Sequence, residues 1–233
     1  MTTGVAGRLD SIRDRIERAC SIAGRDPGEV TLLGAAKRQP GERILAAAGA
    51  GLADFGENIV QEAEAHASLL SGFDVRWHLI GPLQSNKARK AARLFDWIHS
   101  IDRMKIARRL DRECRSIDRV LTGLIEVNLG AEKSKHGFAP QELPAFADEL
   151  FGLDSLRIAG LMAIPPVSST SDETRAWFRQ LRELKDRLFA SGAPEHPGFL
   201  SMGMSADFEI AIEEGATHIR IGTELFGARA PRH

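Results

Sequence analysis

The hydrophobic positions of this chain follow a helical period first and a strand-like pattern next. Near the N-terminus, apolar residues recur every three or four positions, at Leu9, Ile12, Ile16 and Ala19. This spacing predicts an amphipathic helix that ends near Gly24. The run from 30 to 36 is short and almost wholly apolar, as in a strand buried on both faces, and a Pro40-Gly41 break separates it from an Ala-rich helix. Residues 1–50 therefore predict a helix followed by one β-α unit.

Short apolar runs alternate with helical patterns along the rest of the chain as well. The predicted strands are 30–36, 53–55, 76–80, 97–101, 120–128, 157–161, 199–202 and 218–221. The predicted helices between them are 42–50, one from about 58, 85–94, 104–116, 140–150 and 170–192, and short helical segments follow the last two strands. In the helix at 170–192, Thr170 and Glu173 resemble a capping box, and Gly192 is a plausible terminator.

This alternation predicts an α/β fold of the (β/α)₈ TIM barrel type with an extra N-terminal helix. The alternative is an open doubly wound sheet, because alternation alone does not say whether the sheet closes. No Gly/Ser linker, charge block or low-complexity tract divides the chain. Residues 1–233 are therefore expected to form a single domain.

Composition narrows the classes of function. Of the 233 residues, 43% are hydrophobic and 27% are charged, which is enough for a sizeable core, and the formal net charge is -1. Such a balance argues against bulk nucleic-acid binding and against attachment to an anionic membrane. The longest apolar stretch, 44–53, is shorter than the ~20 residues that span a bilayer. We therefore expect a cytoplasmic protein that binds neither nucleic acid nor membrane.

Two scarce residue types limit the chemistry. Cys20 and Cys114 are the only cysteines, and they lack the spacing of a metal site or a disulfide framework, so no metal is expected. The chain contains no Tyr. One whole class of general acid and base is therefore missing from any mechanism.

Lys37 is the first candidate for chemistry. In a barrel of this type the active face is formed by residues at the carboxyl ends of the strands. Lys37 follows the apolar run 32–36 and so places a primary amine where a strand ends. Desolvation there would favour the neutral, nucleophilic amine that forms a Schiff base. The alternative is a surface Lys that leaves the strand for solvent.

Other polar residues near strand ends are open to two interpretations. Asn58 follows the second predicted strand and is either a ligand contact or the cap of the next helix. His78 lies within the third strand, where a hydrogen-bonded core histidine is the alternative to a functional one. The segment 83–87 feeds a helix N-terminus; its amide side chains could hydrogen-bond a ligand, and its lysine fits a solvated helix face equally well.

The last two strands are each followed by small and hydroxyl-bearing residues. Ser201-Met202-Gly203-Met204-Ser205 follows the seventh strand, and Arg220-Ile221-Gly222-Thr223 ends the eighth. Each segment precedes a helix start, where free backbone N–H groups and the helix dipole favour an anion, although structural turns would also explain the small residues. Loops after strands seven and eight are the recurrent phosphate site of such barrels. An amine on strand one combined with this phosphate site indicates a phosphorylated carbonyl compound.

Two ligands fit that description: a sugar phosphate in a Schiff-base aldolase, and pyridoxal 5′-phosphate. Arg220 lies on the last strand beside the phosphate segment. Its guanidinium could meet a pyridine nitrogen or a sugar-phosphate oxygen equally well. The spacing of the residues does not decide between the two ligands.

Motifs spread over nearly the whole chain carry a resemblance to a known family. They are Ala36-Lys37, Phe55-Gly56-Glu57-Asn58, Trp77-His78-Leu79-Ile80-Gly81, Leu83-Gln84-Ser85-Asn86-Lys87, Val127-Asn128, Lys135-His136-Gly137, Gly160-Leu161-Met162, Leu200-Ser201-Met202-Gly203-Met204-Ser205 with Asp207, and Arg220-Ile221-Gly222-Thr223 with Phe226-Gly227. In these motifs the chain resembles the pyridoxal phosphate homeostasis proteins, which are similar to the barrel domain of bacterial alanine racemase.

The resemblance implies pyridoxal 5′-phosphate as the cofactor, bound through a Schiff base to Lys37. It also implies phosphate contacts from the segment 201–205 and from Gly222-Thr223, with Arg220 at the pyridine nitrogen. The cofactor-binding residues expected on this basis are Lys37, Asn58, His78, Ser201, Met204, Ser205, Arg220, Gly222 and Thr223.

Three local departures from the family pattern surround this site. Ala36 stands where the family usually has Ser, Arg38-Gln39-Pro40 where it has Thr-Lys-Pro, and Pro82 where it has His. These changes leave the attachment of the cofactor intact. They put in doubt any proton relay or accessory contact that those positions carry.

The resemblance further implies cofactor handling: binding pyridoxal phosphate, limiting its free concentration and passing it to pyridoxal phosphate-dependent apo-enzymes. The residues favour the same choice, because racemisation needs two opposed bases and this chain has no Tyr and no length for the additional β domain that supplies one in racemases. We therefore expect a monomeric or weakly dimeric homeostasis protein without catalytic residues for amino-acid turnover. The alternatives are a single-domain pyridoxal phosphate-dependent racemase, lyase or decarboxylase, and the sugar-phosphate aldolase.

Overall fold

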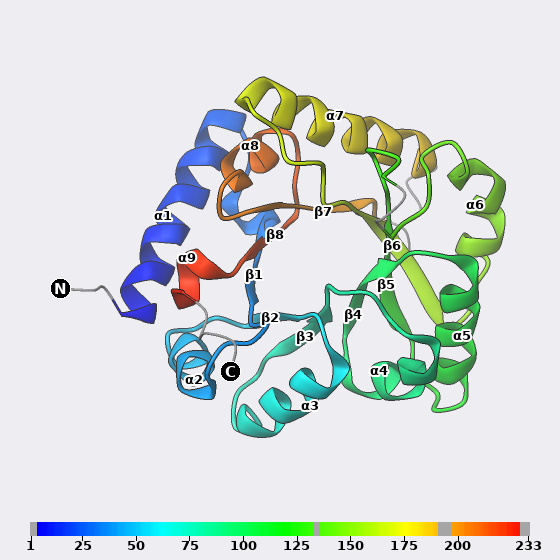
Figure 1. The fold of residues 1–233 in the computed structure, drawn as a ribbon, viewed down its shortest axis with the longest axis horizontal. Coiled ribbons are helices and arrows are strands. Elements are labelled where there is room, and N and C mark those ends of the chain that lie inside the picture. Colours follow the sequence, from blue (N-terminus) through cyan, green and yellow to red (C-terminus); the bar gives the residue numbers. More distant parts are fainter. Residues whose placement is uncertain (1–3, 133–135, 191–196, 229–233) are drawn as a thin grey trace.

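Eight parallel strands curve into a closed barrel in the computed structural model, which describes residues 4–132, 136–190 and 197–228 (Figure 1). The strands are β1 (Thr31–Ala35), β2 (Asp54–Glu57), β3 (Arg76–Leu79), β4 (Trp97–Ile101), β5 (Leu121–Glu126), β6 (Leu156–Met162), β7 (Phe199–Met204) and β8 (His218–Ile221). Each strand pairs with the next, and β8 closes the ring against β1, with Leu33 opposite Arg220. The TIM barrel prediction is confirmed and the open sheet is wrong.

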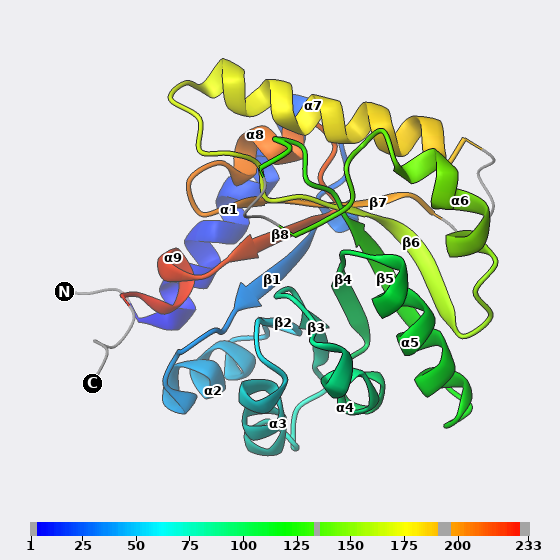
Figure 2. The same cartoon turned by 45° about the vertical axis from the view of Figure 1, so that its right-hand side comes forward.

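Helices cover the outside of the barrel (Figures 1 and 2). They are α1 (Val5–Ala23), α2 (Gly41–Gly49), α3 (Val60–Leu69), α4 (Ala88–Leu94), α5 (Met104–Arg115), α6 (Leu143–Phe151), α7 (Ser171–Leu188), α8 (Phe208–Glu213) and α9 (Thr223–Phe226), with 3₁₀ turns η1 (Pro27–Glu29) and η2 (Ser85–Lys87). The extra helix α1 packs against α2, α8 and α9. None of the helices in the described ranges is long and apolar enough to cross a membrane.

Local sequence signals explain where two of these helices begin and end. Gly24 closes α1 in the left-handed conformation, with φ of 65°, as the sequence predicts. At the start of α7 the Thr170 hydroxyl oxygen accepts a hydrogen bond from the Glu173 amide at 3.2 Å. The Glu173 carboxylate in turn accepts from the amide of Ser169 at 2.9 Å. The proposed terminator, Gly192, lies outside the described residues.

The main hydrophobic core lies between the barrel and its helices, whereas the inside of the barrel is largely polar. A small apolar cluster of Leu124, Ala159 and Met162, flanked by Trp97 and Phe199, fills part of the interior. Polar and charged side chains are buried near it, namely Asp54, His78, His99, Ser201, His218 and Arg220. Barrels of this type usually fill their interior with layers of branched apolar residues. The departure places hydrogen-bonding groups along the barrel interior, from Asp54 and His218 at the amino ends of their strands to Arg220 nearer the carboxyl ends.

Candidate functional site

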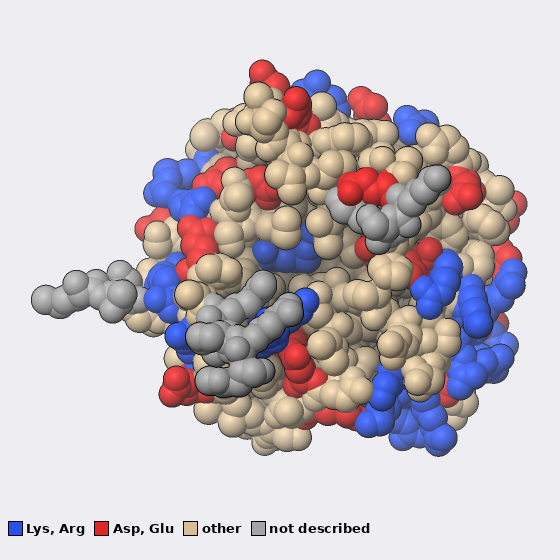
Figure 3. All heavy atoms as spheres, in the orientation of Figure 1, with Lys and Arg blue, Asp and Glu red and all other residues tan. Residues whose placement is uncertain are grey.

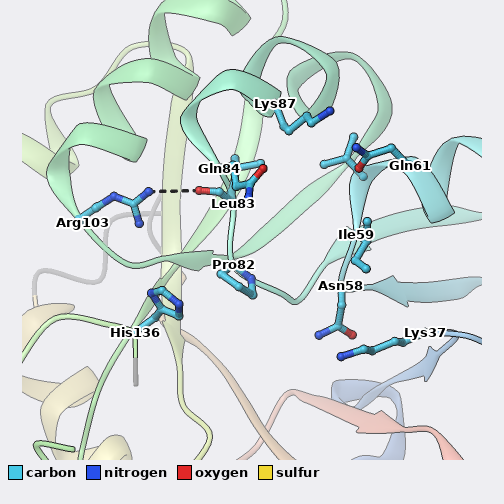
Figure 4. A pocket seen from close by; sticks show the side chains of 11 residues that line it. Lys37, Asn58, Ile59, Gln61, Pro82, Leu83, Gln84, Lys87, Arg103 and His136 are labelled. Atoms are coloured by element: carbon cyan, nitrogen blue, oxygen red, sulfur yellow. Dashed lines mark hydrogen bonds between the residues drawn. The ribbon is translucent and has the colours of Figure 1, made fainter. Parts of the chain in front are cut away.

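A cavity of about 520 Å³ opens at the carboxyl ends of the first strands (Figure 4). It is lined by Lys37, Asn58, Ile59, Val60, Gln61, Pro82, Leu83, Gln84, Lys87, Arg103 and His136. Lys37 follows β1 and Asn58 follows β2, and Figure 4 shows their side chains next to each other. The rule that strand ends form the active face therefore brings these two predicted residues into one cavity.

The turn that carries Lys37 is held at several points. The Ala36 amide donates to the carbonyl of Gly56 on β2, and the Gln39 amide donates to the carbonyl of Ala36, both at 2.9 Å. Arg38 has a positive φ of 57°, an uncommon conformation for a residue with a side chain. Its amide donates to the Glu62 carboxylate on α3 at 3.1 Å. These bonds hold a partly buried Lys37 at the cavity wall.

The structure decides one of the open alternatives at Asn58. The residue that caps α3 is Ile59, and no side chain donates or accepts a capping bond there. Asn58 is therefore not a helix cap, and its amide is available at the cavity beside Lys37. Gln84 and Lys87 line the same cavity, whereas Lys90 pairs with Glu64 at 2.9 Å on the helix surface.

The segments after β7 and β8 reach the same end of the barrel. Met204 is 40% exposed, and its amide donates to the Asp207 carboxylate at 2.6 Å. Ser205 is partly buried, and Thr223 is exposed at the start of α9. Since β8 is the neighbour of β1, this turn lies beside the strand that leads to Lys37. The phosphate contacts expected from these residues stay predictions.

Gly222 leaves open space at that turn. A Cβ atom added to Gly222 would meet only the carbonyl oxygen and Cβ of Ala35, at 3.4 and 3.6 Å. These are ordinary contacts, so the barrel itself does not require a glycine here. The vacant position is suited to a ligand group that approaches the backbone closely.

His78 and Ser201, two of the expected cofactor contacts, have their side chains inside the barrel. Side chains alternate along a strand, and both of these point into the barrel. His78 is hydrogen-bonded to Asp54 and His99, and the Ser201 hydroxyl is hydrogen-bonded to His99 and Arg220. Both side chains are buried and hydrogen-bonded inside the barrel, and neither lines the cavity with Lys37. The core interpretation of His78 therefore fits better.

Arg220 occupies the upper part of the barrel interior. Its guanidinium donates to the Ser201 hydroxyl at 2.7 Å and to the carbonyl of Ala163 at 3.0 Å. Burial lowers the pKa of Arg220 to about 10, against the opposing influence of Asp207 and Glu126. The group still carries its positive charge at neutral pH. Two of its five N–H groups are used in these bonds.

Two carboxyl groups at the mouth were not identified from the sequence. Glu126 ends β5, and Asp102 follows β4. Burial, together with the negative charge of Asp102, raises the pKa of Glu126 to about 7, although Arg220 opposes this. Asp102 pairs with Arg103 and, at 3.3 Å, with His136. Asp102 follows the predicted strand 97–101, so the strand-end rule would have found it, whereas Glu126 lies inside the predicted strand 120–128 and marks the end of the strand only in the structure.

Glu126→Gln is expected to remove a pH dependence of folding stability. The folded-state pKa lies above the ordinary value of about 4.3, so the folded protein holds a proton that the unfolded chain has released. In the wild type the free energy of unfolding should therefore fall as the pH rises from 5 to 8, and Glu126 contributes at most about 3 kcal/mol to that fall. Urea unfolding at both pH values measures it. The exposed Glu183→Gln variant serves as control and should show the same fall as the wild type. If the Glu126→Gln variant showed a fall of that size as well, the assignment of the pH dependence to Glu126 would be contradicted.

Positive side chains gather around this face of the molecule. Figure 3 shows Lys and Arg atoms inside the hollow at the centre of the face and a further group over α4 and α5. The formal net charge of the chain is only -1, so this charge is local. A positive hollow favours an anionic ligand. No group of His, Cys, Asp and Glu within the described ranges could hold a metal ion.

The fold and the lysine-lined mouth define a (β/α)₈ barrel with a positively charged cavity at the carboxyl ends of its strands. The family described as alanine racemase, N-terminal domain, matches residues 8–230, and the chain belongs to it. The resemblance to pyridoxal phosphate homeostasis proteins is confirmed. A protein of that name from Pseudomonas aeruginosa is 45% identical over 225 residues, covering 97% of this chain and 96% of the relative.

Solved structures give the same relationship. PipY of Synechococcus elongatus PCC7942, in its structure with pyridoxal phosphate bound, is 42% identical to this chain, with a TM-score of 0.84. The match covers 96% of this chain and 100% of PipY. Alanine racemase of Clostridium difficile has a TM-score of 0.69 at 14% identity, which is a likeness of fold alone. The match covers 94% of this chain but only 56% of the racemase.

Proposed function

We propose that this chain binds pyridoxal 5′-phosphate as a Schiff base on Lys37 and holds or delivers the cofactor. The observation that carries this proposal is the placement of three groups on two adjoining strands: the amine after β1, the open turn at Gly222 after β8, and the guanidinium of Arg220 on β8. Relatives that bear the name pyridoxal phosphate homeostasis protein, and PipY with pyridoxal phosphate bound, support it.

Each group matches one part of the cofactor. Lys37 would take the aldehyde, with Asn58 beside it in the same cavity. The Ser205 amide after β7 and the Gly222-Thr223 amides at the start of α9 would hold the phosphate, since the Met204 amide already donates to Asp207. Arg220 would donate to the pyridine nitrogen. When bound, the cofactor supplies an electrophilic carbonyl and an electron-accepting ring.

Holding the cofactor fits these residues better than amino-acid chemistry does. A guanidinium cannot accept a proton, so Arg220 at the ring nitrogen disfavours protonation of that nitrogen and weakens the electron sink. The sequence also contains no Tyr, the residue that racemases use as a second base. We infer that the whole chain acts as one cofactor-binding domain with apo-enzymes as recipients.

The loaded protein is expected to exchange its cofactor linkage with amino acids without turning them over. Incubation with L-alanine in deuterated water should change the absorption spectrum, while incorporation of α-deuterium stays far below ordinary enzyme rates of about 1–10³ s⁻¹. Mass spectrometry of the alanine measures this. If α-deuterium were incorporated at those rates, and if Glu126→Gln lost this activity, the chain would be an amino-acid enzyme that uses Glu126 as its base.

A further inference from the structure

A continuous hydrogen-bonded chain crosses the inside of the barrel from Arg220 to Asp54. Its four bonds join Arg220 Nη1 to Ser201 Oγ at 2.7 Å, Ser201 Oγ to His99 Nδ1 at 2.9 Å, His99 Nε2 to His78 Nδ1 at 3.0 Å, and His78 Nε2 to Asp54 Oδ1 at 2.9 Å. The five residues come from β8, β7, β4, β3 and β2. Each is at most 6% exposed. We call these five residues the interior chain.

The Asp54 end sets the direction of the bonds nearest to it. Arg76 holds both oxygens of Asp54, at 2.7 and 2.6 Å. Burial alone would raise the pKa of Asp54, but the hydrogen bonds from Arg76 and His78 lower it to about 2. An ionised carboxylate only accepts, so His78 Nε2 must carry its proton. Burial lowers the pKa of His78, so its ring is neutral and Nδ1 accepts.

The hydrogen bonds at the Arg220 end run in the same direction. A guanidinium only donates, so the Ser201 oxygen accepts from Arg220 and its own proton points to His99 Nδ1. Burial lowers the pKa of His99 well below its ordinary value, and the neutral ring then carries its proton on Nε2, facing His78. Every donor therefore points from Arg220 toward Asp54. Neither end can reverse, because Asp54 cannot donate and Arg220 cannot accept.

We propose that Asp54, His78 and His99 are positioning residues that hold Arg220 toward the cofactor ring. This inference rests on the proposed function, in which Arg220 meets the pyridine nitrogen. None of the three lines the cavity of Lys37, so they act through Ser201. The bonds polarise one another along the chain and orient the Ser201 oxygen that Arg220 binds. A binding group needs such support, since its geometry must hold within about 0.5 Å.

His99→Phe is the variant that breaks the interior chain while keeping a ring of similar size. We expect it to weaken pyridoxal phosphate binding by about tenfold and to shift the visible absorption band, because Arg220 loses its oriented partner. His99→Gln, whose amide can both donate and accept, should restore part of the affinity. In an Arg220→Ala background, His99→Phe should have no further effect on affinity.

His218→Phe is the matched control. His218 is 4% exposed and packs against His78 and His99, with ring centroids 6.2 and 5.6 Å apart, but its hydrogen bond goes to Thr217 and not to the interior chain. We expect this variant to bind the cofactor like the wild type. Equal losses in His99→Phe and His218→Phe, or additive losses with Arg220→Ala, would overturn the proposal.

Side-chain ¹⁵N NMR of the cofactor-free wild type tests the interior chain without any variant. We expect His78 and His99 to be neutral and protonated on Nε2 at pH 7. A proton on Nδ1 of either ring would overturn the assigned direction and, with it, the proposal. If the wild type failed to bind pyridoxal phosphate while both tautomers were as assigned, the proposed function would fail and the interior chain itself would stand.

Discussion

Lys37→Ala is expected to abolish covalent attachment of pyridoxal phosphate. The variant loses the amine at the cavity wall and keeps only noncovalent contacts to the phosphate and ring, so retention should fall at least about a hundredfold. The wild type should purify yellow, and the variant colourless. Borohydride reduction of the loaded wild type followed by peptide mass mapping should find the reduced pyridoxyl group on Lys37. A sugar-phosphate aldolase would show no visible absorption.

Lys87→Ala is the matched control for this experiment. Lys87 is the other lysine that lines the same cavity, on η2, and it tests whether any nearby amine would serve. This variant should stay yellow, with the label still on Lys37. A label on Lys87 or Lys90 and an unmodified Lys37 would overturn the assignment.

Gly222→Val should cause the second largest loss, of about tenfold or more in affinity for pyridoxal phosphate. A side chain at this turn fills the open position and keeps the phosphate from the backbone N–H groups; one charge-assisted bond is worth about 1.5–3 kcal/mol. Pyridoxal, which lacks the phosphate, should bind the variant and the wild type alike. Spectroscopic titration with both compounds measures the difference.

Thermal unfolding shows whether Gly222→Val keeps its fold, and Gly222→Ala offers a smaller step at the same position. The Cβ of alanine makes only ordinary contacts with Ala35, so its effect on folding should be slight. An unchanged affinity for pyridoxal phosphate in Gly222→Val would place the phosphate elsewhere. An equal loss for pyridoxal and its phosphate would mean that the turn acts on the ring instead.

Most of the barrel could be predicted because its elements have local signals. The strands at Trp97–Ile101 and His218–Ile221 have the predicted bounds, and most other elements differ by one to three residues at their ends. Element ends are less well defined because caps and the last hydrogen bonds depend on tertiary contacts. An example is α3, whose N-cap residue, Ile59, makes no side-chain capping bond.

The candidate site was predictable only in part. Position at a strand end selected Lys37 and Asn58, and both line one cavity. The same rule applied to strand four would have selected Asp102, but it would have missed Glu126, because the predicted strand 120–128 extends beyond the observed end of β5. His78 and Ser201 could not be placed from their motifs, since both lie within strands with their side chains toward the barrel interior, where they meet other side chains.

The order of strands and helices, and the amine that follows the first strand, can be predicted from local sequence, because hydrophobic period and strand ends are properties of neighbouring residues. Closure of the sheet and the pairing of β8 with β1 depend on contacts between residues far apart in the sequence. The tertiary structure also decided that His99 meets Ser201, 102 positions away along the chain. Side chains from strands that are not neighbours meet only inside a closed barrel, because curvature brings their inward faces together.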